Sequence, residues 1–352
     1  MSKKKKKKTA SKPKKKKSQF LSTGSTLLNL ACTGKPNKGF RKGHYYFIVG
    51  DSSSGKTFLS LTCLSEAANN PAFKNYRFIH DNAEGGALMK ISEFFGEAVA
   101  ARLEAPGKNG ESSASIEDFY YNMDDALKAG RPFIYILDSM DSLTSSTEGS
   151  KFEETKKADR SGKKAAGSYG DGKAKINAQN MRRLMTPLRK SESILIVISQ
   201  TRDNIGFGFE KKTRSGGHAL RFYASLEIWS SIYGQITKTV KKKKRQLGIS
   251  CLCKVKKNRE TGRIRDIKFP IYHSYGIDDI GGCVDFLVEE NHWKKNDAGT
   301  IIAKEFDLKG NSEKLVHLIE DNSLQNDLRH LVASVWDEIE MACKVKRKKR
   351  YE

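Results

Sequence analysis

The stretch from Tyr45 to Ala68 reads YYFIVGDSSSGKTFLSLTCLSEAA, and it decides the fold of this chain. Its first five residues are apolar and end at a glycine, which is typical of a buried strand. In its last part, side chains recur at helical spacing, at Phe58, Leu59, Leu61, Thr62 and Leu64. A glycine-rich turn therefore joins a strand to the start of a helix.

This turn fits the pattern G-x-x-x-x-G-K-[ST] at every position. Its residues are Gly50, Asp51, Ser52, Ser53, Ser54, Gly55, Lys56 and Thr57. In such a loop, backbone N–H groups converge on phosphate oxygens at the positive end of a helix dipole. Lys56 can reach the β- and γ-phosphates, and the Thr57 hydroxyl can ligate Mg²⁺. An ordinary βα turn is the alternative, but pattern and context together predict a nucleoside triphosphate site.

The chain is strongly basic, with 65 Lys and Arg against 41 Asp and Glu and a net charge of +24. Much of the charge lies in three clusters: Met1–Lys17, Lys241–Arg245 and Lys344–Arg350. Such runs bind polyanions through counterion release. The alternatives for the first cluster are a solubilising tail and, at Pro13–Lys17, a nuclear import signal. The three clusters together favour nucleic acid as the partner.

The length of 352 residues accommodates one large domain and one small domain. No apolar run reaches the roughly 18 residues of a membrane span, so we expect no membrane partner. Six scattered cysteines without a C-x-x-C pair favour reduced thiols in a cytosolic protein over a zinc or disulfide site. We therefore expect a cytoplasmic protein, with nuclear import as the open alternative.

The order of apolar segments predicts an α/β fold. We expect a disordered lysine-rich arm at residues 1–18, a core at 19–280, a small C-terminal α+β domain at 281–343 and a basic tail at 344–352. Besides the segment at Tyr45, strands are expected at 77–80, 132–137, 194–199, 226–232, 248–257 and 263–271. Helices are expected at 87–103, 116–129, 176–190 and 328–341. Strands that alternate with helices, followed by a late antiparallel set, favour a mostly parallel twisted sheet flanked by helices.

One acidic residue stands at the end of a predicted strand. Asp138 follows the apolar run PFIYIL, at the carboxyl end of that strand. In folds with a phosphate loop, an acid at this place holds Mg²⁺ directly or through water. Asp138 is therefore the second predicted metal ligand beside Thr57.

Two polar segments are candidates for contact with nucleic acid. Residues 148–175 show no apolar periodicity, and a long structureless segment in a compact domain is usually functional or mobile. Residues 201–218 interleave apolar and cationic side chains, which suits insertion against bases while cations hold phosphates. The alternative for the second segment is a flexible surface loop. Its cations are Arg202, Lys211, Lys212 and Arg214, and its apolar residues are Ile205, Phe207 and Phe209.

Five motifs together carry a resemblance to a known family. The chain resembles RecA-type homologous recombinases, including phage members, from Leu21 to about Leu287. The motif SGGHALRFYAS (Ser215–Ser225) separates this family from helicases that share the same ATPase core. The motifs are STGSTLLNLA (Ser22–Ala31), VGDSSSGKT (Val49–Thr57), ILDSMDSLT (Ile136–Thr144), VISQTRDNIG (Val197–Gly206) and SGGHALRFYAS (Ser215–Ser225).

The resemblance implies a set of ATP-site residues. Lys56, Thr57 and Asp138 take the roles given above, with ATP and Mg²⁺ as cofactors. Glu84 resembles the carboxylate that polarises the attacking water. The family usually has D-x-E here, whereas Asp81-Asn82-Ala83-Glu84 is one residue longer, so Asp81 is the runner-up. Gln200 resembles the switch residue that reports the nucleotide state to the second DNA loop.

The resemblance also implies DNA contacts. Residues 148–175 correspond to the first DNA-binding loop and residues 203–218 to the second. Matching positions are the cations Lys175 and Arg182, the backbone donors Gly216 and Gly217, and the apolar Ile205 and Phe209, with Ile205 as the wedge between base steps. Lys257 and Arg259 match a pair that reaches the ATP of the neighbouring subunit.

The function implied by the resemblance is that of an ATP-dependent DNA recombinase. It would assemble on single-stranded DNA as a homo-oligomer, a helical filament or a ring, and exchange strands with double-stranded DNA in recombination and repair. Family members carry a helix and a strand before the STGS motif that dock onto the next protomer, where this chain has the lysine-rich arm. The alternatives are a hexameric DNA helicase on the same core and a DNA-binding mediator with little ATP turnover.

Overall fold

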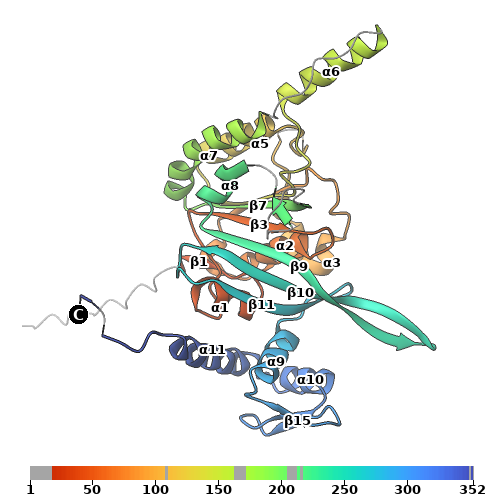
Figure 1. Cartoon of the computed structure of the whole chain (residues 1–352), viewed down its shortest axis with the longest axis vertical. Helices are drawn as coiled ribbons and strands as arrows, with labels where there is room; N and C mark the ends of the chain where they lie inside the picture. Colours follow the sequence, from red (N-terminus) through yellow and green to blue (C-terminus); the bar gives the residue numbers. More distant parts are fainter. Residues whose placement is uncertain are drawn as a thin grey trace, which may run out of the picture.

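The computed structural model describes residues 18–107, 110–161, 172–203, 212–214, 217–348 and 350–351. The described residues form one large sheet with helices on both faces (Figure 1). The sheet order is β12-β11-β10-β9-β3-β7-β6-β4-β5, with β8 paired to β7. Its strands are β3 (Tyr45–Gly50), β4 (Arg77–Asp81), β5 (Leu103–Glu104), β6 (Phe133–Leu137), β7 (Ile194–Asp203), β8 (Lys212–Arg214), β9 (Leu226–Val240), β10 (Lys243–Asn258), β11 (Arg265–Tyr272) and β12 (Gly276–Ile277).

The predicted α/β fold with a mostly parallel core is confirmed. Strands β5, β4, β6, β7, β3 and β9 pair in parallel, and β9 to β12 continue as an antiparallel set. In the register of β3 and β7, Gly50 lies beside Gln200. The carboxyl ends of the parallel strands therefore meet at one edge of the sheet, where ligands bind in folds of this kind.

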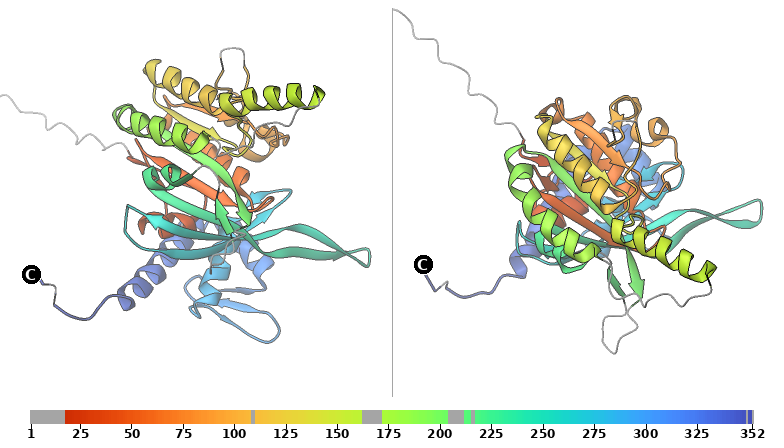
Figure 2. Two further views of the ribbon diagram at one scale, coloured as in Figure 1. Left: turned by 45° about the horizontal axis from the view of Figure 1, so that its top comes forward. Right: turned by 90° about the horizontal axis from the view of Figure 1, so that it is seen from above.

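Strand β3 is buried on both faces, which explains its unbroken apolar run. Tyr46 and Ile48 face a core shared with helices α1 and α2. Tyr45, Phe47 and Val49 face a second core shared with α5, α7 and α8. Figure 2 shows these helices on opposite sides of the sheet. The helices are α1 (Thr26–Thr33), α2 (Lys56–Ala68), α5 (Ile116–Lys128), α7 (Lys173–Lys190) and α8 (Gly217–Tyr223).

Smaller elements complete the first part of the core. Strands β1 (Phe20–Leu21) and β2 (Phe40–Arg41) pair with each other around α1, and a short 3-10 helix, η1 (Pro71–Phe73), precedes β4. In the part of the chain that the structure describes, no helix has both the length and the hydropathy that crossing a bilayer requires.

The C-terminal segment packs against the core. It consists of α9 (Asp279–Glu289), β13 (Lys294–Lys295), β14 (Ile301–Ala303), β15 (Leu308–Gly310), α10 (Ser312–Asp321) and α11 (Gln325–Ala342). Trp293, Leu315 and Trp336 share the same apolar cluster as α1 and α2. Glu340 of α11 accepts two hydrogen bonds from Arg265 of β11, at 2.6 and 2.8 Å. The division expected after residue 280 falls inside α9.

Two predicted segments differ from the structure. The single helix expected at 87–103 is wrong, because α3 (Ile91–Phe95) and α4 (Glu97–Ala100) are separated by Gly96, whose φ of 90° ends a right-handed helix. The structureless segment expected from residue 148 begins instead with α6 (Ser146–Arg160), which has a capping box between Ser145 and Glu148. None of its residues is buried, so this helix leaves no apolar periodicity in the sequence.

Three strands are longer than expected. β7 continues past Ser199 through Gln200 to Asp203 and pairs with β8, so part of the expected 201–218 loop is a hairpin. β9 and β10 extend to a turn at Lys241 and Lys242, and most of the KKKKR cluster belongs to β10. Helix α7 likewise begins at Lys173, earlier than the expected residue 176. The residues of these outer strand segments whose burial the structure describes are half-buried or exposed, and the segments lack the apolar runs that mark buried strands.

Candidate nucleotide and nucleic-acid site

The phosphate loop lies between the end of β3 and the start of α2, as predicted. A Cβ on Gly50 would lie 2.4 Å from the backbone oxygen of Ser230 in β9. Gly55 has a φ of 89°, and a Cβ there would lie 2.5 Å from Cδ1 of Ile271. Gly50 is therefore required because its backbone lies so close to β9, and Gly55 because of its positive φ. The N-terminus of α2 opens on this loop and offers its N–H groups to an anion.

Lys56 is buried at the start of α2, with 8% of its surface exposed. Its Nζ donates to the carbonyl oxygens of Gly50 at 3.0 Å and Asp51 at 2.6 Å, so it folds back over the loop. Burial lowers the pKa of Lys56, while the nearby carboxylates of Asp138 and Glu84 act in the opposite direction. The loop thus holds a cation where phosphate oxygens would sit.

Thr57 and Asp138 lie side by side, although they are 81 residues apart in the chain. The Thr57 hydroxyl donates to Oδ2 of Asp138 at 2.6 Å. Burial, and to a smaller extent the negative charge of Glu84, raise the pKa of Asp138 above its usual value. The hydrogen bond from Thr57 acts in the opposite direction but does not cancel this rise in pKa. A hydroxyl and a carboxylate next to a phosphate loop are ligands that suit Mg²⁺, so the residues present fit this ion.

The structure separates the two candidates for activation of water. Glu84 lies in the pocket: its backbone N donates to the carbonyl of Asp138 at 2.9 Å, and its Oε1 accepts from Nε2 of Gln200 at 3.0 Å. Asp81 is fully buried away from the pocket. Its carboxylate accepts hydrogen bonds from the backbone N and the hydroxyl of Ser113, at 2.8 and 2.6 Å, and from the Tyr135 hydroxyl at 2.6 Å.

Asp51 connects the phosphate loop to the β7–β8 hairpin. Its carboxylate accepts a hydrogen bond from the Thr201 hydroxyl and one from Nζ of Lys212 at 2.6 Å. Burial raises the pKa of Asp51, but the hydrogen bonds from Lys212 and Thr201 outweigh this and lower it overall. Beside this link, the backbone N of Gln200 donates to Asp141 at 2.7 Å. Sequence analysis gave Asp51 no contact outside the loop and did not identify Asp141.

These residues surround a pocket of about 310 Å³. Besides the loop, Glu84, Asp138 and Gln200, it is lined by residues that sequence analysis missed. These are Phe58, Gly86, Met89, Ile249, Ile271, Tyr272 and His273. Four of them belong to β10, β11 or the turn after β11, about 200 residues along the chain from the loop. Only the strand order brings them to it, and no motif marks them.

The starts of α7 and α8 adjoin each other. Gly217 begins α8 with a φ of 78°, and a Cβ there would lie 3.0 Å from Cβ of Ala174 in the first turn of α7. Lys175 and Arg182 are exposed on α7, and Arg202 is exposed at the end of β7. The C-terminal ends of the two predicted DNA loops therefore lie close together. Ile205, Phe209, Lys211 and Gly216 lie outside the described residues, and Arg214 is described only as a backbone position of β8.

Lys257 and Arg259 do not line the pocket of their own chain. Nζ of Lys257 donates to the carbonyl oxygens of Arg221 at 2.5 Å and Phe222 at 2.8 Å, and the Arg259 guanidinium donates to that of Phe222 at 2.6 Å. Two cations therefore cap the C-terminal end of α8, where the helix dipole favours positive charge.

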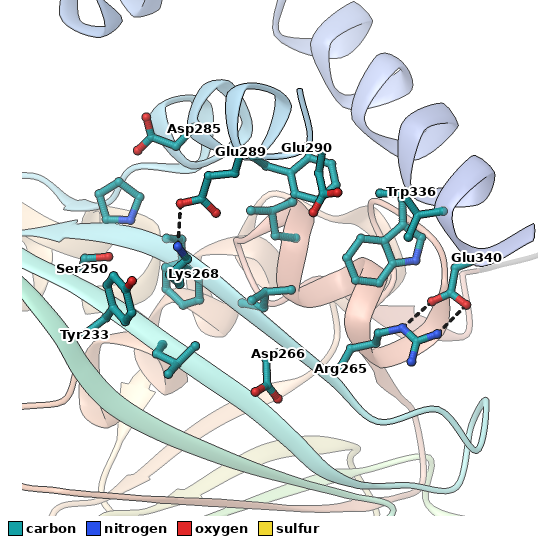
Figure 3. A pocket seen from close by; sticks show the side chains of 17 residues that line it. Tyr233, Ser250, Arg265, Asp266, Lys268, Asp285, Glu289, Glu290, Trp336 and Glu340 are labelled. Carbon is teal, nitrogen blue, oxygen red and sulfur yellow. Dashed lines mark hydrogen bonds and ion pairs between the residues drawn. The ribbon is translucent and has the colours of Figure 1, made fainter. Parts of the chain in front are cut away.

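A second pocket, of about 290 Å³, lies between β10, β11, α9 and α11 (Figure 3). The ion pairs Arg265–Glu340 and Lys268–Glu289 and the indole of Trp336 lie around it. No residue of the phosphate loop lines it, so it is separate from the nucleotide pocket.

The chain is similar to one family of known proteins. The family profile described as the RecA N-terminal domain matches residues 4–278. A protein RecA from Chlorobaculum tepidum is 28% identical over 319 residues, which cover 89% of this chain and 83% of the relative. One from Cytophaga hutchinsonii is 30% identical over 274 residues, or 76% of this chain and 68% of the relative. One from Colwellia psychrerythraea is 29% identical over 280 residues, which cover 78% of this chain and 72% of the relative.

Proposed function

Because this chain belongs to the RecA family, we propose that it is an ATP-dependent recombinase that assembles on single-stranded DNA and exchanges strands with a homologous duplex. The observation that carries the proposal is the chain of contacts from the phosphate loop to the β7–β8 hairpin. Asp51 of the loop contacts Thr201 and Lys212 of the hairpin, and Glu84 of the pocket contacts Gln200. The hairpin forms the start and the end of the expected second DNA loop.

Each pocket residue has a role in ATP hydrolysis under this proposal. Lys56 and the N–H groups of the loop bind phosphate oxygens and stabilise the charge that develops on them. Thr57 and Asp138 would hold Mg²⁺, which neutralises phosphate charge. The Glu84 carboxylate orients the attacking water and accepts its proton. Gln200 keeps Glu84 in place until a γ-phosphate competes for its amide.

The same contacts give a route from nucleotide to DNA. A ligand couples two sites when it favours one of two arrangements of an element that both sites touch. The β7–β8 hairpin is such an element, because β7 runs through Gln200 to Asp203 and pairs there with β8, the strand that precedes α8 in the chain. ATP in the pocket would order the hairpin through Gln200 and Asp51, and DNA bound to the same loop would favour the same order.

We further propose that the site is completed by a neighbouring copy through Lys257 and Arg259. Both side chains now hold carbonyl oxygens at the end of α8, on the helix that follows the second loop. Two cations that reach the phosphates of a neighbour would stabilise transferring charge as an arginine finger does. Assembly, ATP turnover and loop order would then depend on one another.

The central test is joint-molecule formation between single-stranded DNA and a homologous duplex. We expect joints with ATP and Mg²⁺, and none with ADP or without nucleotide, because only ATP orders the loops. A duplex of unrelated sequence is the control. Displacement of a strand from a tailed duplex, without any joint, would instead favour the helicase. DNA binding with no ATP turnover and no joints would favour the mediator.

The contact between Asp51 and Lys212 allows a test of the coupling alone. We expect Asp51→Asn and Lys212→Gln each to reduce by about 5- to 10-fold the ratio of single-strand affinities measured with ATP and with ADP. The double variant should lose little more than either single variant, because both changes remove the same contact. Lys35→Gln, at an exposed position away from the pocket, is the matched control. Strictly additive losses would show that the two residues do not act together.

A further inference from the structure

The β9–β10 hairpin leaves the sheet as a two-stranded ribbon. Pairing of β9 with β3 ends at Ser230, beside Gly50 of the phosphate loop. Pairing of β10 with β11 ends at Gly248. From Thr237 to Gln246 the two strands pair only with each other, and Figures 1 and 2 show the ribbon projecting from the body. It therefore extends beyond the edge of the sheet where the nucleotide pocket lies.

The end of this ribbon carries six cations and no acid. They are Lys238, Lys241, Lys242, Lys243, Lys244 and Arg245, and every residue from Lys238 to Gln246 is exposed. Lys238 forms an ion pair with Glu313 at 3.4 Å. Within the described residues, no ion pair involves the other five. Lys238 also stands directly opposite Arg245 in the register, a like-charge pair that weakens a ladder.

The turn itself is made from residues that disfavour its conformation. Lys241 and Lys242 have φ angles of 49° and 62°. A two-residue hairpin turn with positive φ at both positions usually has Asn-Gly, because L side chains other than Asn and Asp rarely adopt this conformation. Lysine at both places makes the turn less stable than Asn-Gly would, but it adds positive charge at the tip. Backbone strain of this kind indicates a functional surface.

We propose that this ribbon is a binding arm for double-stranded DNA. A two-stranded ribbon fits the major groove of B-DNA. Its four outer residue pairs span about 13 Å, which exceeds the ~8.5 Å depth of the groove. Lysines at the tip and on both strands can then reach phosphates on either side of the groove.

The composition of the ribbon favours a duplex over a single strand. Proteins that hold single strands stack the bases on aromatic side chains. From Gly234 to Gly248 the sequence contains no aromatic residue, and its uncharged polar side chains are Gln235, Thr237, Thr239 and Gln246. Such side chains contact phosphates and the edges of paired bases. The role of the arm depends on the proposed function. In a recombinase, the arm would bring the duplex to the single strand that is already bound at the loops.

The test compares a ribbon without its charge to a matched control. The ribbon variant is Lys241→Asn, Lys242→Gly, Lys243→Thr and Lys244→Thr, which retains a favoured turn and strand residues. The control variant changes four exposed lysines elsewhere, Lys35, Lys38, Lys74 and Lys128, to Gln. Both lose the same charge. Binding of a fluorescent duplex by nucleotide-free protein is measured across ~50 to 200 mM salt.

We expect the ribbon variant to bind the duplex about tenfold or more weakly than the control variant. The slope of log affinity against log salt should become about 2 to 4 units less steep, since each phosphate contact contributes about 0.9. Replacing the same four lysines with Arg should retain the wild-type affinity. Equal affinity and slope in the ribbon and control variants would overturn the proposal. So would loss of binding to vesicles of anionic phospholipid with unchanged binding to the duplex.

A second measurement on the same samples tests the proposed function separately from the arm. ATP-dependent binding of a single-stranded oligonucleotide should persist in the ribbon variant, because the phosphate loop and the two DNA loops are unchanged. If the wild type shows no such dependence on ATP, the recombinase function fails while the duplex measurement still decides on the arm. Equal melting temperatures of the two variants verify that the ribbon change leaves the core folded.

Discussion

Replacing Lys56 with alanine is expected to lower the rate of ATP hydrolysis by about 100- to 1,000-fold and to abolish joint molecules. Lys56 is the cation that the phosphate loop places over its own carbonyl oxygens. Without it, the negative charge that develops on the transferring phosphate has no fixed positive partner inside the pocket. Turnover with saturating single-stranded DNA, and joint formation in the same buffer, measure the two effects.

The matched control for Lys56 is an exposed lysine outside every proposed site. Lys38→Ala removes the same charge at an exposed position and should leave both activities within about twofold of the wild type. The unfolding midpoint of each variant shows whether the core is intact. If Lys56→Ala still forms joints as well as the wild type, the role of the phosphate loop in strand exchange is wrong.

The second large effect concerns the general base, the group that accepts the proton of the attacking water. Glu84→Gln should reduce ATP turnover by about 100-fold or more while ATP still binds, because an amide cannot accept the proton of the attacking water. The amide oxygen of the new side chain could still accept the hydrogen bond from Gln200, so the pocket keeps its shape. Equilibrium binding of a fluorescent ATP analogue, measured beside turnover, separates the loss of chemistry from the loss of affinity.

Asp81→Asn is the matched comparison, because it makes the same chemical change at the rival carboxylate. Asp81 accepts three hydrogen bonds in a fully buried place. An amide would turn a donor toward at least one of these donors, at a cost of about 1 to 3 kcal/mol in the free energy of unfolding. We expect lower stability and near-normal turnover per folded molecule. The opposite result, an inactive but stable Asp81→Asn and an active Glu84→Gln, would assign the base to Asp81.

Much of the fold was predictable from apolar runs, and most of the failures share one cause. The buried strands at Tyr45, Phe133 and Ile194 each appear as an unbroken apolar run, because both faces of a parallel sheet are covered. Helix α6 and the outer parts of β9 and β10 have no buried residue. Capping, turn geometry and cross-strand hydrogen bonds form these elements, and none of these leaves a period in hydropathy.

The candidate site divides in a similar way. By itself, the sequence determined the phosphate loop, with Lys56 and Thr57, because eight consecutive residues contain all the groups that make it. The tertiary structure alone decided that Glu84 lies in the pocket while Asp81 turns into the core, that Asp51 meets Lys212, and that Ile271 and Tyr272 line the nucleotide site. The physical reason is distance along the chain: these contacts join segments that only the order and register of the strands bring together.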